Sequence, residues 1–282
     1  MATIHPATEN LFKLADRKLL IRGRTSRSGR VVVSGAKNSA VAVLPACLLA
    51  EGVSVVQNVP DIADVAVQRQ ILESLGAEVT DGAEPGELRI AAGDIGTEVP
   101  YNLAKQLRGS VLLLGPLVAR KGRARVPLPG GCAIGSRPLD LHLKALRELG
   151  AEVEIEHGHI VARADRLVGT EVYLDFPSVG ATENLIRAAT AARGTTVVYN
   201  AAKEPEVVDL ANFLNAMGAR GVGAGTDTIK IEGGRELHPV EYTIIPDRIE
   251  AGTYLLMGLA GGGSVTVENV IPKHLEALLA KL

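Results

Sequence analysis

The residue best suited to chemistry is Cys132, which lies in the segment LPGGCAIGSRP at 128–138. Glycines on both sides give this thiol an open, adaptable backbone. Arg137 follows in the same segment, and a guanidinium near a thiol lowers its pKa toward the nucleophilic thiolate. We therefore interpret Cys132 as a reactive thiol. The other cysteine, Cys47, lies in an apolar run and is interpreted as an inert buried residue.

Lys37 and Asn38 form a second candidate site, because they open a predicted helix over 37–50. The segment SGAKN at 34–38 would bring free backbone N–H groups and an ammonium to one point, where the helix dipole favours an anion. The same sequence would also suit an ordinary helix cap with a solvated lysine. Both interpretations stay open on this segment alone.

A third candidate is Arg108, which precedes the apolar run SVLLL at 110–114. A guanidinium offers a planar set of donors that matches a phosphate or a carboxylate. An internal ion pair with Asp or Glu is the alternative interpretation, because a buried arginine needs a partner. Arg108 is therefore a candidate for binding an anionic group.

A repeated unit must position these residues. The letters GVSVVQN at 52–58 return as GTTVVYN at 194–200 and as GSVTVEN at 263–269. Each copy joins β-branched residues to a glycine entry, which predicts a short strand. The helical patterns between the strands end in glycines that are typical of left-handed helix caps, at Gly76, Gly150 and Gly218.

The predicted elements indicate an α/β protein with its sheets outside and its helices inside. Strand segments such as 153–155 and 229–231 alternate apolar and polar residues, as strands with one wet face do. The predicted helices over 37–50 and 182–192 are instead apolar nearly all round, which is typical of enclosed helices. In two copies of the repeat a capping glycine follows the Asn by 18 residues, so the third copy predicts one at about 287. Since the chain has 282 residues, we expect a C-terminally truncated chain or one completed by another polypeptide.

Composition narrows the class of protein further. The residues are 46% hydrophobic and 22% charged with a formal net charge of −2, which excludes a disordered chain and one that coats nucleic acid. Aromatic residues make up 3%, so an aliphatic core is expected. Two cysteines cannot form a disulfide framework, and no apolar run reaches the roughly 18–20 residues that span a membrane. We expect a soluble protein of a reducing, cytoplasmic compartment.

Together these segments resemble the UDP-N-acetylglucosamine 1-carboxyvinyltransferases, a family of enolpyruvyl transferases. The resemblance covers about 20–282 and rests on SGAKN (34–38), VPDIADV (59–65), LGPLVAR (114–120), PGGCAIGSRPLDLH (129–142), SVGAT (178–182), NAAKEPEVVD (200–209) and PDRIEAGT (246–253). The sister enzymes that make 5-enolpyruvylshikimate 3-phosphate share the fold, but they lack the cysteine segment. We therefore rank them lower.

The resemblance implies transfer of the enolpyruvyl group from phosphoenolpyruvate to the 3′-hydroxyl of UDP-N-acetylglucosamine, the first committed step of peptidoglycan precursor synthesis, with no metal or organic cofactor. In the family, the cysteine that matches Cys132 protonates phosphoenolpyruvate and is alkylated by fosfomycin. Lys37 and Arg137 would hold the charges of phosphoenolpyruvate. The nucleotide sugar would be bound by Asn38, Arg108, Arg137, Pro138, Leu139, Asp140, Leu141, Ser178 and Val179.

The family fold implies two inside-out α/β barrels, each built from three βαβαββ units. On this pattern 37–245 forms a complete three-unit domain, and 22–36 with 246–282 forms an incomplete second barrel of one unit. Residues 1–21 are an N-terminal extension. The aspartate that takes the hydroxyl proton in the family has no counterpart here, so we expect impaired turnover by this chain alone.

Two other readings of the sequence stay open. The chain could be a non-catalytic fragment or regulatory module that binds UDP-N-acetylglucosamine. Alternatively, a second chain could supply the missing units and restore the enzyme. In every reading the ligands are small molecules, with no nucleic acid or membrane partner, because the charge balance leaves no broad basic surface.

Overall fold

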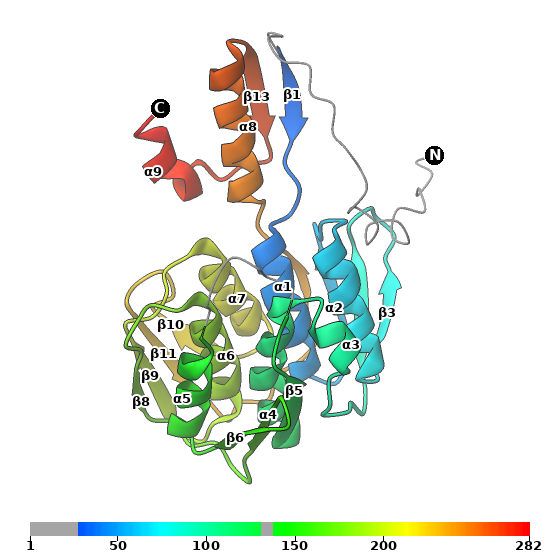
Figure 1. Cartoon of the computed structure of the whole chain (residues 1–282), viewed down its shortest axis with the longest axis vertical. Helices are drawn as coiled ribbons and strands as arrows, with labels where there is room; N and C mark the ends of the chain where they lie inside the picture. Colours follow the sequence, from blue (N-terminus) through cyan, green and yellow to red (C-terminus); the bar gives the residue numbers. More distant parts are fainter. Residues whose placement is uncertain (1–27, 131–137) are drawn as a thin grey trace.

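The computed structural model describes residues 28–130 and 138–282 and shows two lobes, one above the other in Figure 1. The large lobe runs from α1 (Lys37–Ala46) to β12 (Glu241–Thr243). The small lobe contains β1 (Ser28–Val32), α8 (Arg248–Gly261), β13 (Ser264–Glu268), η4 (Pro272–Leu275) and α9 (Glu276–Leu279). No helix in the described part of the chain is long and apolar enough to cross a membrane.

Three similar units build the large lobe, each with an inner helix, a strand, an outer helix and an antiparallel pair of strands. The first contains α1, β2 (Gly52–Gln57), α2 (Ala63–Ser74), β3 (Glu78–Asp81) and β4 (Leu88–Ala92). The second contains α4 (Leu114–Lys121), β5 (Arg123–Pro127), α5 (Asp140–Glu148), β6 (Glu152–Glu156) and β7 (His159–Arg163). The third contains α6 (Val179–Ala191), β9 (Thr195–Tyr199), α7 (Pro205–Ala216), β10 (Arg220–Val222) and β11 (Thr228–Glu232). Two short helices, α3 (Tyr101–Ala104) and η3 (Arg108–Leu113), lie between the first and second units. A third, η2 (Cys47–Leu49), follows α1 within the first unit.

Each unit of the large lobe forms its own sheet. The strand orders are β12-β2-β4-β3, β5-β7-β6 and, with β8 (Glu171–Tyr173), β10-β11-β9-β8. Parallel pairs join β2 to β12 and β9 to β8, and in the small lobe β13 to β1. Because β1 precedes the large lobe and α8 follows it, the chain passes between the lobes twice.

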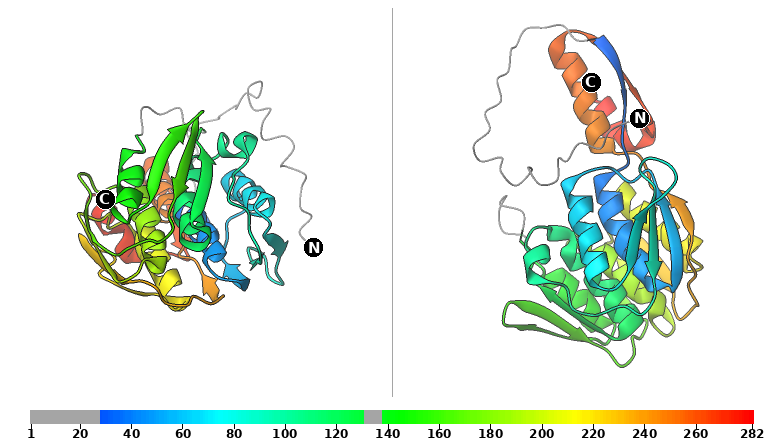
Figure 2. Two further views of the ribbon diagram at one scale, coloured as in Figure 1. Left: turned by 90° about the horizontal axis from the view of Figure 1, so that it is seen from below. Right: turned by 90° about the vertical axis from the view of Figure 1, so that its right-hand side faces the viewer.

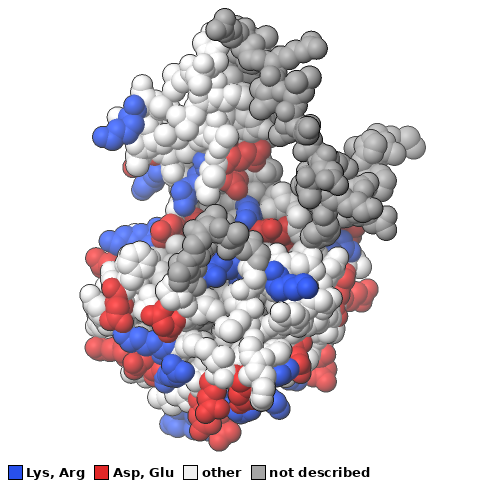
Figure 3. Space-filling model, viewed as in Figure 1, with Lys and Arg blue, Asp and Glu red and all other residues white. Residues whose placement is uncertain are grey.

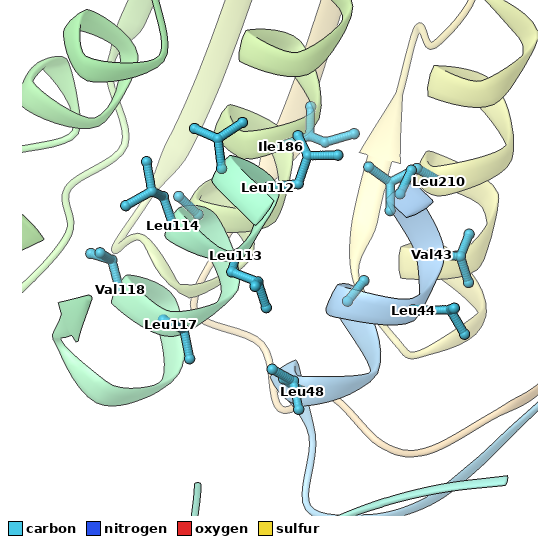
Figure 4. Packing of buried hydrophobic residues seen from close by; sticks show 14 of the residues in the cluster. Val43, Leu44, Leu48, Leu112, Leu113, Leu114, Leu117, Val118, Ile186 and Leu210 are labelled. Atoms are coloured by element: carbon cyan, nitrogen blue, oxygen red, sulfur yellow. The ribbon is translucent and has the colours of Figure 1, made fainter. Parts of the chain in front are cut away.

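The inner helices α1, α4 and α6 lie at the centre of the large lobe, and the sheets lie around them (Figure 2). Eight of the ten residues of α1 are buried. Figure 4 shows Leu44 of α1, Leu117 of α4 and Ile186 of α6 within one continuous aliphatic cluster. The predicted arrangement, with helices inside and sheets outside, is confirmed.

The first inner helix is shorter than predicted. It ends at Ala46 and continues as the 3-10 turn η2 rather than as α-helix to residue 50. Pro45 lies in its last turn and has no N–H to donate to the preceding turn, which favours this early end. The helix expected over 182–192 instead begins at Val179, because the Ser178 side chain caps it.

The repeated letters have a structural cause at their final Asn. Asn58, Asn200 and Asn269 adopt left-handed φ angles of 59°, 55° and 55°, which Asn tolerates better than most residues. Each side chain donates from Nδ2 to a main-chain oxygen beside the parallel neighbour: Asn58 to Ile244 (3.0 Å), Asn200 to Leu174 (2.7 Å) and Asn269 to Val33 (2.7 Å). The Asn therefore ties each strand end to the strand beside it.

The predicted glycine caps are also confirmed. Gly76, Gly150 and Gly218 have φ angles of 96°, 93° and 106°, in the region that side chains with a Cβ rarely adopt. A glycine with a left-handed φ angle therefore follows the outer helix of each of the three units. The helical periodicity and the turn chemistry of this sequence therefore agree on where the outer helices stop.

Candidate functional site

A pocket of about 430 Å³ lies where the N-termini of α1 and α8 meet, and we call it the junction pocket. Its lining residues are Lys37, Asn38, Asp247, Ile249, Glu250, Thr253 and Tyr254. Figure 3 shows basic and acidic side chains together at the level where the two lobes join. Lys37 and Asn38 are the predicted site residues that line this pocket within the described ranges.

The two connections between the lobes lie side by side below the pocket. Ala36 N donates to Ile245 O at 2.8 Å, and Asp247 N donates to Ser34 O at 2.9 Å. A Cβ on Gly35 would lie 1.6 Å from Asn58 O, so only glycine fits between these segments. The glycine of the SGAKN segment is thus required by the close approach of two connections, and Lys37 follows directly from it.

One carboxylate occupies the N-termini of both helices at the pocket. Asp247 Oδ1 accepts from Ile249 N (2.7 Å) and Glu250 N (3.0 Å), in the first turn of α8. Its Oδ2 accepts from Lys37 N at 3.0 Å, at the start of α1. The helix N-terminus predicted to attract an anion is therefore already paired with an internal carboxylate.

The ammonium of Lys37 has a partner as well. Its Nζ lies 2.7 Å from Asp64 Oδ2, and the two side chains are 52% and 35% exposed. An ion pair this accessible can exchange partners at small cost, because water and salt screen it. Lys37 thus lines the pocket in an exchangeable ion pair. The sequence left open an anion-binding lysine and a solvated one, and the structure shows features of both.

Asn38 points its carboxamide at a buried acid. Its Nδ2 donates to Glu206 Oε1 at 3.0 Å, and Glu206 at the start of α7 is 5% exposed. Arg248, the first residue of α8, donates from Nη2 to both oxygens of the same carboxylate at 3.4 Å. Sequence reasoning missed Glu206 as a site residue. The signal available was its position in NAAKEPEVVD, where an acid follows a helix-starting proline.

The other predicted binding residues within the described ranges lie in η3 and around the starts of α5 and α6. Ser178 caps α6 by accepting from Ala181 N at 3.3 Å. A Cβ on Gly180 would lie 2.8 Å from the ring of His142, so the first turns of α5 and α6 touch. The structure thus brings the predicted residues of two motifs together: Pro138 and Asp140 are exposed, and Leu139, Leu141, Ser178 and Val179 are half-buried.

His142 at the start of α5 is buried near two arginine charges. Burial, helped by the charges of Arg108 and Arg187, lowers its pKa to about 4. Its Nδ1 lies 2.9 Å from Asn184 Nδ2, which also donates to Val111 O at 2.9 Å. A neutral imidazole ring therefore holds the start of α5 against α6, and Arg108 lies close enough to affect it electrostatically.

The cysteine prediction is tested in part. Cys132 and Arg137 lie outside the described residues. Cys47 is 1% exposed, burial raises its pKa to about 12, and its Sγ donates to Val43 O at 3.7 Å. The interpretation of Cys47 as an inert buried residue is confirmed.

The helix α6 departs from the expectation of an apolar helix. Glu183 and Arg187 are both buried in it, one turn apart, with Oε2 and Nη2 separated by 3.9 Å. Burial raises the pKa of Glu183 to about 7, while Arg187 opposes that rise. Arg187 also donates to Ala42 O of α1. A buried charge pair is tolerated here because each charge offsets the other.

Metal ligands do not cluster in the described residues. No three side chains of His, Cys, Asp or Glu converge as a metal site would need within 28–130 and 138–282. The polar groups at the junction pocket are instead paired with one another, cation to carboxylate.

Comparison with known proteins places the chain in a family. A family model described as EPSP synthase (3-phosphoshikimate 1-carboxyvinyltransferase) matches residues 21–282. The chain belongs to this EPSP synthase family. Its N-terminal boundary agrees with the extent of the resemblance found in the motifs.

Within this family, curated relatives share the name UDP-N-acetylglucosamine 1-carboxyvinyltransferase. One from Symbiobacterium thermophilum is 53% identical over 272 residues, which cover 95% of this chain and 62% of the relative. One from Carboxydothermus hydrogenoformans is 52% identical over 266 residues, which cover 94% of this chain and 63% of the relative. The resemblance read from the motifs is confirmed, and the chain spans less than two thirds of the length of these relatives.

Solved structures of an enolpyruvyl transferase and of an EPSP synthase confirm the fold. The enolpyruvyl transferase NikO from Streptomyces tendae matches with a TM-score of 0.73 at 29% identity, over 83% of this chain and 56% of that one. EPSP synthase from Acinetobacter baumannii matches with a TM-score of 0.70 at 21% identity, over 88% of this chain and 57% of that one. The predicted enolpyruvyl transferase fold of repeated α/β units is therefore correct.

Proposed function

We propose that this chain serves the transfer of the enolpyruvyl group from phosphoenolpyruvate to the 3′-hydroxyl of UDP-N-acetylglucosamine, with release of phosphate. The observation that carries the proposal is identity of 52–53% to two enzymes of that name over 94–95% of the chain. The product is the first committed precursor of peptidoglycan. Because the match spans 62–63% of those enzymes, the proposal covers only those steps of the transfer whose binding and catalytic residues lie in this chain.

The proposed chemistry at phosphoenolpyruvate uses three residues. Cys132 is the acid that protonates the methylene carbon, which leaves an oxocarbenium-like carbon for the sugar hydroxyl to attack. Loss of phosphate and of one proton from the new methyl group then restores the double bond. Lys37 and Arg137 hold the negative charges of phosphoenolpyruvate and of the departing phosphate. The 2.7 Å ion pair between Lys37 and Asp64 supports this role, since an exposed pair can release its ammonium to a substrate anion.

In this proposal, the nucleotide sugar is bound by Asn38 at the junction pocket and by further residues, most of them at the starts of α5 and α6. The contact between His142 and Gly180 supports it, because that contact places the start of α5 beside the start of α6. The proposed binding residues are Asn38, Arg108, Arg137, Pro138, Leu139, Asp140, Leu141, Ser178 and Val179. We place this reaction in the cytoplasm, because two cysteines without a disulfide framework favour a reducing compartment.

We also propose that 37–245 is a complete domain of three units, and that 22–36 with 246–282 belongs to a second domain. The exposed apolar face of α8 supports this division, because only Ala251 and Gly252 of its fourteen residues are buried. Two further βαβαββ units, on another polypeptide, would cover that face. Size-exclusion chromatography tests this: a stable complex with such a polypeptide supports it, and no association contradicts it.

Calorimetry with UDP-N-acetylglucosamine, followed by an assay of phosphate release from both substrates, tests the proposed function. Binding with slow turnover is expected, since several catalytic groups of the longer relatives would act together and their loss costs about 10²–10⁴ in rate each. Binding without any turnover favours the alternative, a non-catalytic binding module. No binding of the nucleotide sugar contradicts both.

The thiol assignment has its own test by mass spectrometry. Fosfomycin with the nucleotide sugar should add covalent mass at Cys132 and leave Cys47 unmodified, because burial keeps Cys47 protonated and inaccessible. Cys132→Ser should abolish the added mass. An adduct on Cys47 would refute the assignment.

A further inference from the structure

We propose that Glu206 is a positioning residue that holds Asn38 in the orientation needed for ligand binding and ties it to Arg248. This inference rests on the proposed function, in which Asn38 contacts the nucleotide sugar. Glu206 itself touches no ligand in this proposal. Glu206 lies at the start of α7 and contacts Asn38 at the start of α1 and Arg248 at the start of α8.

The contacts single out this carboxylate. Its side chain is 7% exposed, whereas that of Arg248 is 32% exposed and Asn38 is an exposed residue. Oε1 accepts from Asn38 Nδ2 at 3.0 Å and shares Arg248 Nη2 with Oε2 at 3.4 Å. A buried carboxylate needs such partners, because removing it from water without them would be costly. Burial and pairing together keep its position constant.

A carboxylate determines which way the Asn38 carboxamide faces. A carboxylate paired with a guanidinium can only accept, so Asn38 must turn its amino group toward Glu206 and its carbonyl oxygen away. Among the described residues, the contact with Glu206 is the one side-chain hydrogen bond of Asn38. Asn38 lines the junction pocket, so the Oδ1 turned away from Glu206 is the atom to which a ligand hydroxyl or amide N–H would donate.

Glu206→Gln is the most informative variant. Gln has the same shape, but its amide can either donate or accept, so both orientations of Asn38 become possible. It also removes the negative charge that pairs with Arg248. Glu204→Gln is the matched control, because Glu204 lies two residues away, is half-buried, and its side chain does not cap α7.

The first measurement needs no ligand. The side-chain amide of Asn38 is identified in ¹⁵N–¹H spectra by its loss in Asn38→Ser. Its resonances should shift in Glu206→Gln and stay unchanged in Glu204→Gln, with the thermal transition of both variants retained. Unchanged Asn38 resonances in Glu206→Gln would overturn the proposal, whatever the chain binds.

The second measurement is a double-mutant cycle on the Kd for UDP-N-acetylglucosamine by calorimetry. Glu206→Gln should weaken binding about tenfold, as loss of a charged hydrogen-bond partner does. In an Asn38→Ala background the same change should matter less than about twofold, because Glu206 acts through Asn38. Additive losses would overturn the positioning role. Failure of the unaltered chain to bind would instead refute the proposed function, and the resonance measurement would still decide the role of Glu206.

Discussion

The helices α1 and α8 hold the same place in the repeat but differ in their surroundings. Each precedes a strand that carries the repeated letters, β2 or β13. Eight of the ten residues of α1 are buried, against two of the fourteen in α8. Leu259 of α8 is 59% exposed, whereas Leu44 of α1 is fully buried. The comparison teaches that an apolar sequence makes a helix suitable for burial, while neighbouring units provide the burial.

The enclosed environment of the large lobe should make its buried charges costly to disturb. Arg187→Met removes the partner of Glu183 within that core. We expect a loss of about 3–5 kcal/mol in the free energy of unfolding at pH 8, since Glu183 is then buried without its counter-charge. Denaturant unfolding measures it. Adding Glu183→Gln should recover most of the loss, and a double variant as unstable as Arg187→Met would contradict this account.

The same pair gives the large lobe a pH dependence. Because the folded pKa of Glu183 is raised from 4.5 to about 7, the folded state binds this proton more tightly than the unfolded state. Its contribution to stability is therefore present below pH 4.5, falls as the pH rises to about 7, and levels off above that. In Glu183→Gln the unfolding free energy should vary less across this window. An unchanged slope would show that other groups cause it.

The junction between the lobes should be the next most sensitive place. Gly35→Ala would place a Cβ 1.6 Å from Asn58 O. The backbone must shift to relieve this overlap. We expect a loss of about 3 kcal/mol in unfolding free energy. Gly29→Ala in β1 is the control, because nothing lies within 4 Å of its new Cβ. Equal effects of the two changes would mean that the connections are not tightly packed.

The Asn residues of the repeat allow the lobes to be compared directly. Asn200→Ala in the large lobe and Asn269→Ala in the small lobe each remove a 2.7 Å hydrogen bond and force Ala into a left-handed conformation. We expect a loss of about 1–2 kcal/mol for Asn200→Ala in global unfolding. For Asn269→Ala we expect faster hydrogen exchange in β1 and β13 with little change in global unfolding. The reverse pattern would show that the small lobe holds the large one together.

Local chemistry made much of the fold predictable from the sequence. The spacing from Gly to Asn could be recognised because each Asn must adopt a positive φ and reach a neighbouring strand. The capping glycines could be recognised for a similar reason. Lys37 and Asn38 could be selected because a glycine and two polar residues open an otherwise apolar helix.

The partners of these residues could not be predicted in the same way. Asn38 meets Glu206 across 168 positions of sequence, and Asp247 reaches Lys37 across 210. The first pair depends on the packing of α1 against α7 within the large lobe. The second depends on the two passages of the chain between the lobes, which bring the starts of α1 and α8 together. The residues next to Lys37 in the sequence indicate that its helix N-terminus can attract an anion. They do not indicate that the carboxylate of Asp247 already lies there.

The smallest effect is expected on the open face of α8. Leu259→Gln should change the unfolding free energy by less than about 0.5 kcal/mol, because a side chain that is 59% exposed loses little burial. Leu44→Ala in α1 is the contrasting control, with an expected loss of about 2–5 kcal/mol from a cavity in the core. Denaturant unfolding of both variants measures the difference between enclosed and open copies of one helix. A loss above about 1 kcal/mol for Leu259→Gln would mean that this face of α8 is already packed in the isolated chain, and that no further unit is needed to cover it.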